Sequence, residues 1–279
     1  MLKLMYITNS PDIARVAQNA GVDRIFVDME YIGKADRQGG MNTVQNHHTA
    51  EDALAVKRVL DKAQLVVRCN PIHNASDEYD STEDEINSII AAGADIIMLP
   101  FFKSPSEVER FVKAVDGRAK TMPLVETPEA VACIDDILSV GGIDELYIGL
   151  NDLSLGYGKK FMFELLADGT VENLCNKFRH RGIPYGFGGI ASPGKGMLPA
   201  EYVIKEHYRL GSTCAILSRS FCNTSIEGVN LNEITSVFAD GVCKIRNAEN
   251  ECVNQTEAFF INNRREVADI VRRISCGIK

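Results

Sequence analysis

The chain has 279 residues, a 45% hydrophobic fraction and a net charge of −8, so it can bury a large core as one α/β barrel or as two smaller domains. The acidic balance argues against a nucleic-acid partner, because no basic face is available to displace counterions. No apolar run is long enough to cross a membrane, and the N-terminus lacks a signal-peptide pattern. The eight cysteines contain no CxxC pair, and these features together predict a cytoplasmic protein.

Eight short apolar segments are predicted to form β-strands. In chain order they are Leu2–Ile7, Arg24–Asp28, Leu65–Val67, Ile96–Leu99, Thr121–Val125, Leu146–Ile148, Pro184–Phe187 and Thr213–Leu217. Helices are predicted between and after them, several opened by a capping residue or a first-turn proline. They run from Pro11 to near Gly21, over Ala50–Leu60 and Thr82–Ala92, from Pro105 onward, from Pro128 to about Val140, and over Met162–Arg179 (broken near Gly169), Ala200–Leu210, Asn230–Phe238 and Asn262–Ile274.

Strands and helices that alternate at intervals of roughly 25–40 residues predict a (β/α)8 TIM barrel. The alternative is an open doubly wound sheet, but no G-x-G-x-x-G follows the first strand. Polar residues also end strands all across the sheet, and a barrel would gather them around one mouth: Glu30, Arg68, Glu126, Asp152 and Arg219. We expect a single domain over residues 1–279, with residues 226–279 as a C-terminal helical extension.

Two of these strand ends carry carboxylates that suit a metal ion. Glu126 directly follows the fifth strand, and Asp152 follows the sixth. Neighbouring parallel strands joined by a right-handed crossover would bring both side chains to the same edge of the sheet. Two acids with no basic residue between them suit a hard divalent cation that keeps open positions for water and substrate. The alternative is a pair of carboxylates that only cap helices.

The chain resembles the HpcH/HpaI aldolase and citrate lyase superfamily, whose members are metal-dependent barrels of the phosphoenolpyruvate/pyruvate type. The similar pieces occur in the family's order and spacing and extend from about Gly21 to Gly158. They are Gly21-Val22-Asp23 through Asp28-Met29-Glu30, Val67-Arg68-Cys69-Asn70-Pro71, Ala92-Gly93-Ala94-Asp95 through Leu99-Pro100, Val125-Glu126-Thr127, and Ile148-Gly149-Leu150-Asn151-Asp152-Leu153-Ser154.

The resemblance implies a Mg²⁺ or Mn²⁺ ion bound by Glu126 and Asp152. It implies a carbon–carbon lyase or aldolase that acts on a 2-oxo acid such as pyruvate, or on a related acid, through an enolate. Arg68 would neutralise the developing enolate oxygen, and the amides of Asn151 and Asp152 would bind the substrate carboxylate. A cation and a guanidinium beside an oxyanion supply the stabilisation that such chemistry needs. A homo-oligomer is also implied, with the last helix in subunit contacts.

The chain departs from the aldolase pattern at two positions. Aldolases of this family carry a histidine after the acidic residue of strand two, and Tyr31 stands there instead. A phenol with an ordinary pKa of about 10 is a poor base at neutral pH. Leu124 stands where the aldolases often have glutamine. The Arg68-x-Asn70-Pro71 signature favours the citrate-lyase-like branch. An alternative function is therefore a barrel that binds an acid, possibly phosphorylated or sugar-derived, without aldolase turnover.

The remaining candidate residues each have a structural and a functional interpretation. Arg68 could have a purely structural role as the ion-pair partner of Asp28 or Glu30, but we favour an active-site role. Glu30 could hold a metal-bound water or orient Arg68.

Further candidates lie in two loops. His48 could be a solvated residue or a helix cap. It could instead replace the missing histidine as a general base, if its loop folds over the mouth. Lys34 and Arg37 could bind a phosphate or carboxylate of the substrate. Gly189 could allow close approach of a ligand to the backbone, although a simple turn also explains it.

Overall fold

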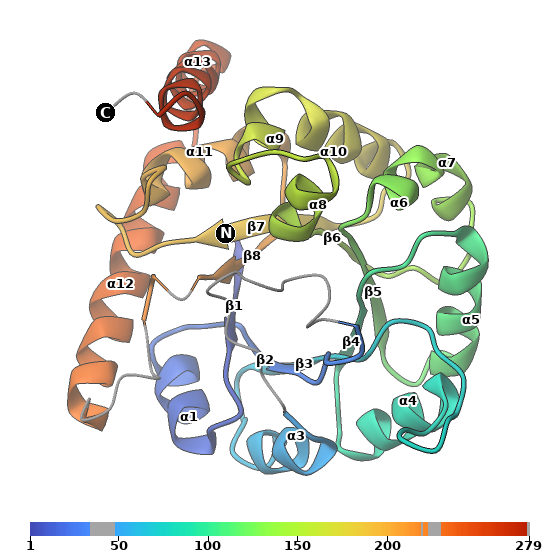
Figure 1. Ribbon diagram of the computed structural model, residues 1–279. Coiled ribbons are helices and arrows are strands. Elements are labelled where there is room, and N and C mark those ends of the chain that lie inside the picture. Colours follow the sequence, from blue (N-terminus) through green and yellow to red (C-terminus); the bar gives the residue numbers. More distant parts are fainter. Residues whose placement is uncertain (34–47, 219, 223–229, 278–279) are drawn as a thin grey trace.

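The computed structural model describes residues 1–33, 48–218, 220–222 and 230–277. Eight parallel strands pair in sequence order into a closed barrel, and helices surround it (Figure 1). The predicted (β/α)8 fold is confirmed. The strands are β1 (Lys3–Ile7), β2 (Arg24–Asp28), β3 (Gln64–Arg68), β4 (Ile96–Leu99), β5 (Lys120–Val125), β6 (Leu146–Ile148), β7 (Tyr185–Ile190) and β8 (Cys214–Leu217).

Several of the helices begin where the sequence supplies a capping side chain. Thr49 accepts a hydrogen bond from Asp52 N–H, and the Asp52 carboxylate accepts one from Thr49 N–H, which forms a reciprocal cap. Ser10, Ser81 and Thr127 cap three further helices. The helices are α1 (Pro11–Asn19), α3 (Ala50–Lys57), α4 (Thr82–Ala91), α5 (Pro105–Val115), α6 (Pro128–Ala132), α7 (Ile134–Ile137), α8 (Leu150–Gly156), α9 (Glu164–Ala167), α10 (Thr170–His180), α11 (Ala200–Leu210), α12 (Leu231–Cys252) and α13 (Glu257–Ser275).

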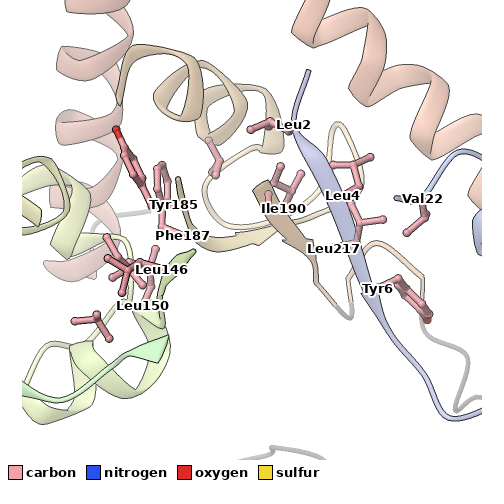
Figure 2. Packing of buried hydrophobic residues seen from close by; sticks show 14 of the residues in the cluster. Leu2, Leu4, Tyr6, Val22, Leu146, Leu150, Tyr185, Phe187, Ile190 and Leu217 are labelled. Atoms are coloured by element: carbon pink, nitrogen blue, oxygen red, sulfur yellow. The ribbon is translucent and has the colours of Figure 1, made fainter. Parts of the chain in front are cut away.

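Strand residues alternate between two hydrophobic clusters, because successive side chains of a strand point to opposite faces. On β1, Leu4 and Tyr6 belong to the large cluster between barrel and helices, whereas Met5 belongs to the small cluster inside the barrel. Figure 2 shows Leu4 and Tyr6 on the side of β1 where Val22 lies. The interior cluster fills the barrel with side chains such as Phe26, so a ligand has to bind at an end of the barrel.

A buried ion pair fills the end of the barrel where the strands begin. The guanidinium of Arg24 donates to both carboxylate oxygens of Glu145 at 2.8 and 2.6 Å and to Gln64 at 3.2 Å. The Arg24 side chain has no solvent exposure. Because this pair is satisfied by good geometry, the barrel tolerates two buried charges there. The polar residues that follow the strands lie at the opposite end of the barrel, where the strands finish.

β7 contains an irregularity that the sequence prediction missed. The predicted end of this strand at Phe187 is wrong, because the strand continues to Ile190. The pairing register with β8 shifts between Gly186 and Gly189, and Gly188 has a φ of 58°, which suits glycine. The hydroxyl of Tyr147 donates to Gly188 C=O and accepts from Ile216 N–H at 2.9 Å. One buried side chain thus bridges the disturbed ladder.

The predicted helix from Pro128 to about Val140 is wrong as a single element. It consists of α6 and α7, which meet at Cys133, where φ is −109° and ψ is 24°. The two late helices are longer than predicted. Asn230 caps α12 at its predicted start, and the helix continues beyond Phe238 to Cys252, whereas α13 begins earlier than predicted, after its cap Thr256. Val267 and Val271 on α13 are buried, and α13 packs on α9 and α11 of its own chain.

Within the described residues, no helix combines the length and the apolar character needed to cross a membrane.

Candidate active site

The polar strand-end residues gather at the mouth of the barrel. Asp28 and Arg68 are partners in the register of β2 and β3. Val125 and Ile148, which precede the two candidate metal ligands, are partners in the register of β5 and β6. The strand-end interpretation therefore holds for the two pairs of neighbouring strands β2–β3 and β5–β6, and it brings the acidic and basic groups to one end of the barrel.

Glu126 is a buried carboxylate in an acidic environment. The residue is 4% exposed, and its Oε1 accepts the N–H of Phe101 at 3.0 Å. Phe101 has a left-handed φ of 49°. The backbone therefore turns sharply after β4, at the residue whose N–H binds Glu126. Burial raises the pKa of Glu126 to about 8; the charge of Arg68 opposes this rise, and the charges of Glu30 and Asp152 add to it. This carboxyl group would ionise more readily beside an additional cation.

Asp152 lies in the first turn of α8, directly after β6. Its side chain is half-buried, and its Oδ1 accepts a hydrogen bond from the side-chain amide of Asn151 at 3.2 Å. The sequence predicted that Asp152 follows the strand but did not predict the short helix. Asn151 itself is exposed. Its observed contact orients Asp152, and its role in binding a substrate carboxylate stays a prediction.

Glu126 and Asp152 line the same pocket, which has a volume of about 530 Å³. Its walls come from the segments that follow β4, β5 and β6, and they include Phe101, Lys103, Pro128 and Leu155. The sequence analysis did not single out Lys103, although its position shortly after a strand end is a usable signal. The two candidate ligands are thus brought together at a concave site with access from solvent.

Arg68 forms the centre of a buried ion cluster beside this site. Its Nε and Nη2 donate to the two carboxylate oxygens of Asp28, each at 2.8 Å, and Nη2 lies 3.2 Å from Glu30 Oε2. Burial alone would lower the pKa of Arg68, but Asp28 and Glu30 raise it well above its ordinary value. Arg68 also interacts electrostatically with Glu126. The structure thus contains both contacts that the sequence suggested, to Asp28 and to Glu30.

His48 lies next to the Asp28–Arg68 pair. Its Nδ1 accepts the backbone N–H of Asp28 at 3.1 Å. A neutral imidazole that accepts at Nδ1 carries its proton on Nε2, where it is a donor. This tautomer does not favour a general base, although the ring itself lies at the end of β2, against the backbone of Asp28. The role of His48 in proton transfer stays a prediction.

Tyr31, which replaces the aldolase histidine, is 44% exposed. Partial burial, followed by the nearby charges of Glu85, Asp80 and Glu78, raises the pKa of its phenol above 10. Its backbone N–H donates to Asn70 Oδ1 at 2.9 Å, and the Asn70 side-chain amide donates to Glu85 at 2.8 Å. Asn70 therefore ties the chain after β2 to α4. Its motif was recognisable in the sequence, but this anchoring role was not.

Some predicted site residues cannot be placed against the pocket. Lys34, Arg37 and Arg219 lie outside the described residues. Gly189 lies inside β7, and a Cβ atom there would lie 3.3 Å from Cβ of Ser218, the residue that follows β8. Its part in ligand binding stays a prediction.

The donor set fits a divalent cation that takes only two ligands from the protein. In the part of the chain that the structure describes, no group of three or more His, Cys, Asp or Glu residues could hold a metal ion. Mg²⁺ commonly binds through one or two carboxylates and keeps water or substrate in its other positions. Burial, together with the charges of Glu30 and Asp152, raises the pKa of Glu126, and an ion beside Glu126 and Asp152 would favour the ionised carboxylate.

Comparison with known proteins gives a consistent result. The family model described as HpcH/HpaI aldolase/citrate lyase matches residues 3–162. No curated protein matches the chain. An HpcH/HpaI aldolase/citrate lyase family protein from Burkholderia cenocepacia J2315 has a TM-score of 0.59 at 15% identity, over 78% of this chain and 87% of that one. An HpcH/HpaI aldolase from Desulfitobacterium hafniense DCB-2 has a TM-score of 0.56 at 17% identity, over 88% and 93%. At these identities the two structures support the fold alone.

Proposed function

Because the chain belongs to the HpcH/HpaI aldolase/citrate lyase family, we propose that it is a divalent-metal-dependent carbon–carbon lyase or aldolase that acts on a 2-oxo acid, such as pyruvate, or on a related acid. The observation that carries the proposal is the shared pocket of Glu126 and Asp152 at the barrel mouth. Arg68 lies close enough to Glu126 to influence its ionisation, so a cationic group is available next to the same site.

Each residue has a defined task in this proposal. Glu126 and Asp152 would hold Mg²⁺ or Mn²⁺, and the bound ion would polarise the oxygens of the acid. Arg68 stabilises the negative charge that develops on the enolate oxygen as the carbon–carbon bond forms or breaks. Asp28 and Glu30 hold the guanidinium in place beforehand, so little reorganisation is needed during the reaction.

Enolisation of pyruvate tests the proposal without knowledge of the second substrate. We expect Mn²⁺ or Mg²⁺ to promote exchange of the pyruvate methyl protons for deuterium, followed by NMR. Glu126→Gln and Asp152→Asn should each abolish the exchange, whereas the surface control Asp240→Asn should not, because Asp240 is exposed on α12 and pairs with Lys244. Metal-dependent exchange that persists in both site variants would contradict the proposal.

A second candidate function is a barrel that binds an acid without turnover. It is favoured by the raised pKa of Tyr31 and by the acceptor role of His48 Nδ1, since neither group is then prepared to remove a proton. Metal-dependent binding of pyruvate by calorimetry, with no exchange of its methyl protons, would support this function. Contacts of Lys34 and Arg37 with a phosphorylated or sugar-derived acid remain part of it as a prediction.

A further inference from the structure

We propose that Lys103 is a specificity-determining residue that binds a second anionic group, a carboxylate or a phosphate, at the end of the substrate remote from the metal ligands. This inference rests on the proposed function and narrows its substrate class. The substrate would be a 2-oxo acid, or related acid, whose far end is negatively charged.

The size of the pocket is the first argument. A volume of about 530 Å³ falls within the range of ~300–1,000 Å³ that accommodates whole drug-sized ligands. A three-carbon acid held at Glu126 and Asp152 would leave much of this space empty. The rest of the pocket is therefore available to a longer substrate or to a second reactant.

The charge distribution is the second argument. Lys103 is the one cationic side chain among the described residues that line the pocket, and three carboxylates line it as well: Glu126, Glu129 and Asp152. A divalent ion would compensate the inner pair of carboxylates. An anion at the outer end of the pocket would find a favourable partner in Lys103.

The position of the Lys103 ammonium is the third argument. The Nζ atom lies 3.3 Å from Glu129 Oε1 and 5.3 Å from the centre of the Phe101 ring. Both contacts hold the ammonium at the pocket wall. The ion pair is half-exposed on both sides, with 50% and 54% of the side chains accessible. Such surface pairs are weak, so an incoming carboxylate or phosphate can replace Glu129 as the partner of Lys103.

The apolar residues of the pocket wall indicate what else the substrate carries. Phe101, Pro128 and Leu155 all line the pocket, and the Leu155 side chain is 40% exposed. A short hydrocarbon segment would cover these apolar surfaces. A 2-oxo acid with a methylene chain and a terminal anion matches the pocket from its metal end to its rim.

The backbone of Lys103 is fixed as well. Its N–H donates to Glu107 Oε2 at 2.7 Å, and Glu107 completes the cap of α5. The bent residue Phe101 immediately precedes this segment. A purely structural role would explain the pair with Glu129 equally well, but such a role predicts no dependence of ligand affinity on the charge of the ligand's far end.

Calorimetry with the Mn²⁺-loaded protein separates these roles. The probes are oxalate, which has no tail; 2-oxopentanoate, which has a neutral tail; 2-oxoglutarate, with a terminal carboxylate; and phosphonopyruvate, with a phosphonate. We expect at least one of the two anion-tailed acids to bind about tenfold more tightly than 2-oxopentanoate. A charge-assisted hydrogen bond supplies enough free energy for a difference of this size. The preferred acid identifies carboxylate or phosphate as the second anion.

Variants assign the preference to Lys103. Lys103→Met should abolish it and leave oxalate binding unchanged, whereas Lys103→Arg should retain it. Glu129→Gln should strengthen it by removing the competing carboxylate. The control Lys113→Met alters an exposed lysine of α5 that is not among the pocket residues and should have no effect.

The possible failures are distinguishable. Oxalate binding without any tail preference, or a preference that persists in Lys103→Met, would overturn this inference alone. Absence of Mn²⁺-dependent oxalate binding would overturn the proposed function and this inference with it.

Discussion

Gly149 and Glu126 approach each other so closely that a side chain at residue 149 would collide with the carboxylate. A Cβ atom on Gly149 would lie 2.7 Å from Oε2 and 2.8 Å from Cβ of Glu126. Gly149 directly precedes α8, which carries Asp152. The absence of a side chain therefore lets β6 and α8 bring the second candidate ligand against the first.

Gly149→Ala should weaken metal binding and destabilise the protein. The added methyl group would push Glu126 or α8 away, and such overpacking typically costs about 1–3 kcal/mol. Urea unfolding and Mn²⁺ titration measure the two effects. Gly141→Ala is the matched control, since a Cβ atom there has no neighbour within 4 Å. Equal stability and equal Mn²⁺ affinity of the two variants would show that the close approach of Gly149 to Glu126 contributes neither to stability nor to metal binding.

The sequence was most informative where elements are short, apolar and sharply bounded. β2, β4 and β6 have the predicted bounds, because each is a buried run that ends at a polar residue or a turn. The break between α6 and α7 at Cys133 and the extension of β7 were not predictable from local pattern. The second depends on the Tyr147 hydroxyl, which reaches the disturbed ladder from another strand.

The candidate site shows the same division. Glu126 and Asp152 could be paired from the sequence, because residues at the ends of neighbouring parallel strands meet at one edge. The pocket position of Lys103 and the anchoring of Asn70 by Glu85 could not, because both depend on how side chains meet across loops and helices. The tautomer-determining contact of His48 with Asp28 likewise requires the folded chain.

Glu126→Gln should change how the stability of the metal-free protein depends on pH. The pKa of Glu126 is raised from 4.5 to about 8 in the folded protein, so the folded state favours the protonated acid. Its contribution to stability is complete below about pH 4.5 and is lost as the pH rises through 8, a change of roughly 5 kcal/mol at most. Glutamine does not ionise and should avoid this loss.

Urea unfolding in EDTA at pH 5, 7 and 9 measures the effect. The stability advantage of Glu126→Gln over the wild type should be largest at pH 9. A given concentration of Mn²⁺ should then stabilise the wild type more than the variant, because the variant retains only the Asp152 carboxylate as a ligand and binds the ion more weakly. A constant difference between the two proteins at all three pH values would refute the assigned ionisation.

Arg68→Met should be strongly destabilising. The variant removes the guanidinium that contacts the buried carboxylates of Asp28 and Glu30, and breaking a buried pair in this way costs about 3–5 kcal/mol. The control Arg110→Met removes a pair with Glu83 whose side chains are 33% and 47% exposed, so its cost should stay near or below ~1 kcal/mol. Similar losses in both variants, measured by urea unfolding, would argue against a buried ion cluster at the mouth.

Tyr147→Phe should destabilise β7 and β8. The variant leaves Gly188 C=O and Ile216 N–H without the hydroxyl that bridges them, which costs about 1–3 kcal/mol. Amide exchange at Ile216 should accelerate in parallel. The exposed control Tyr157→Phe should change stability by less than ~0.5 kcal/mol. An unchanged exchange rate at Ile216 would mean that the hydroxyl is not its partner in solution.

The most direct test of the central claim is a Mn²⁺ titration followed by electron paramagnetic resonance, because free and bound Mn²⁺ differ in signal. We predict one binding site per chain in the wild type and in Asp240→Asn, with affinity lowered by at least an order of magnitude in Glu126→Gln and in Asp152→Asn. Wild-type affinity in both site variants would contradict the claim that these two carboxylates hold the ion.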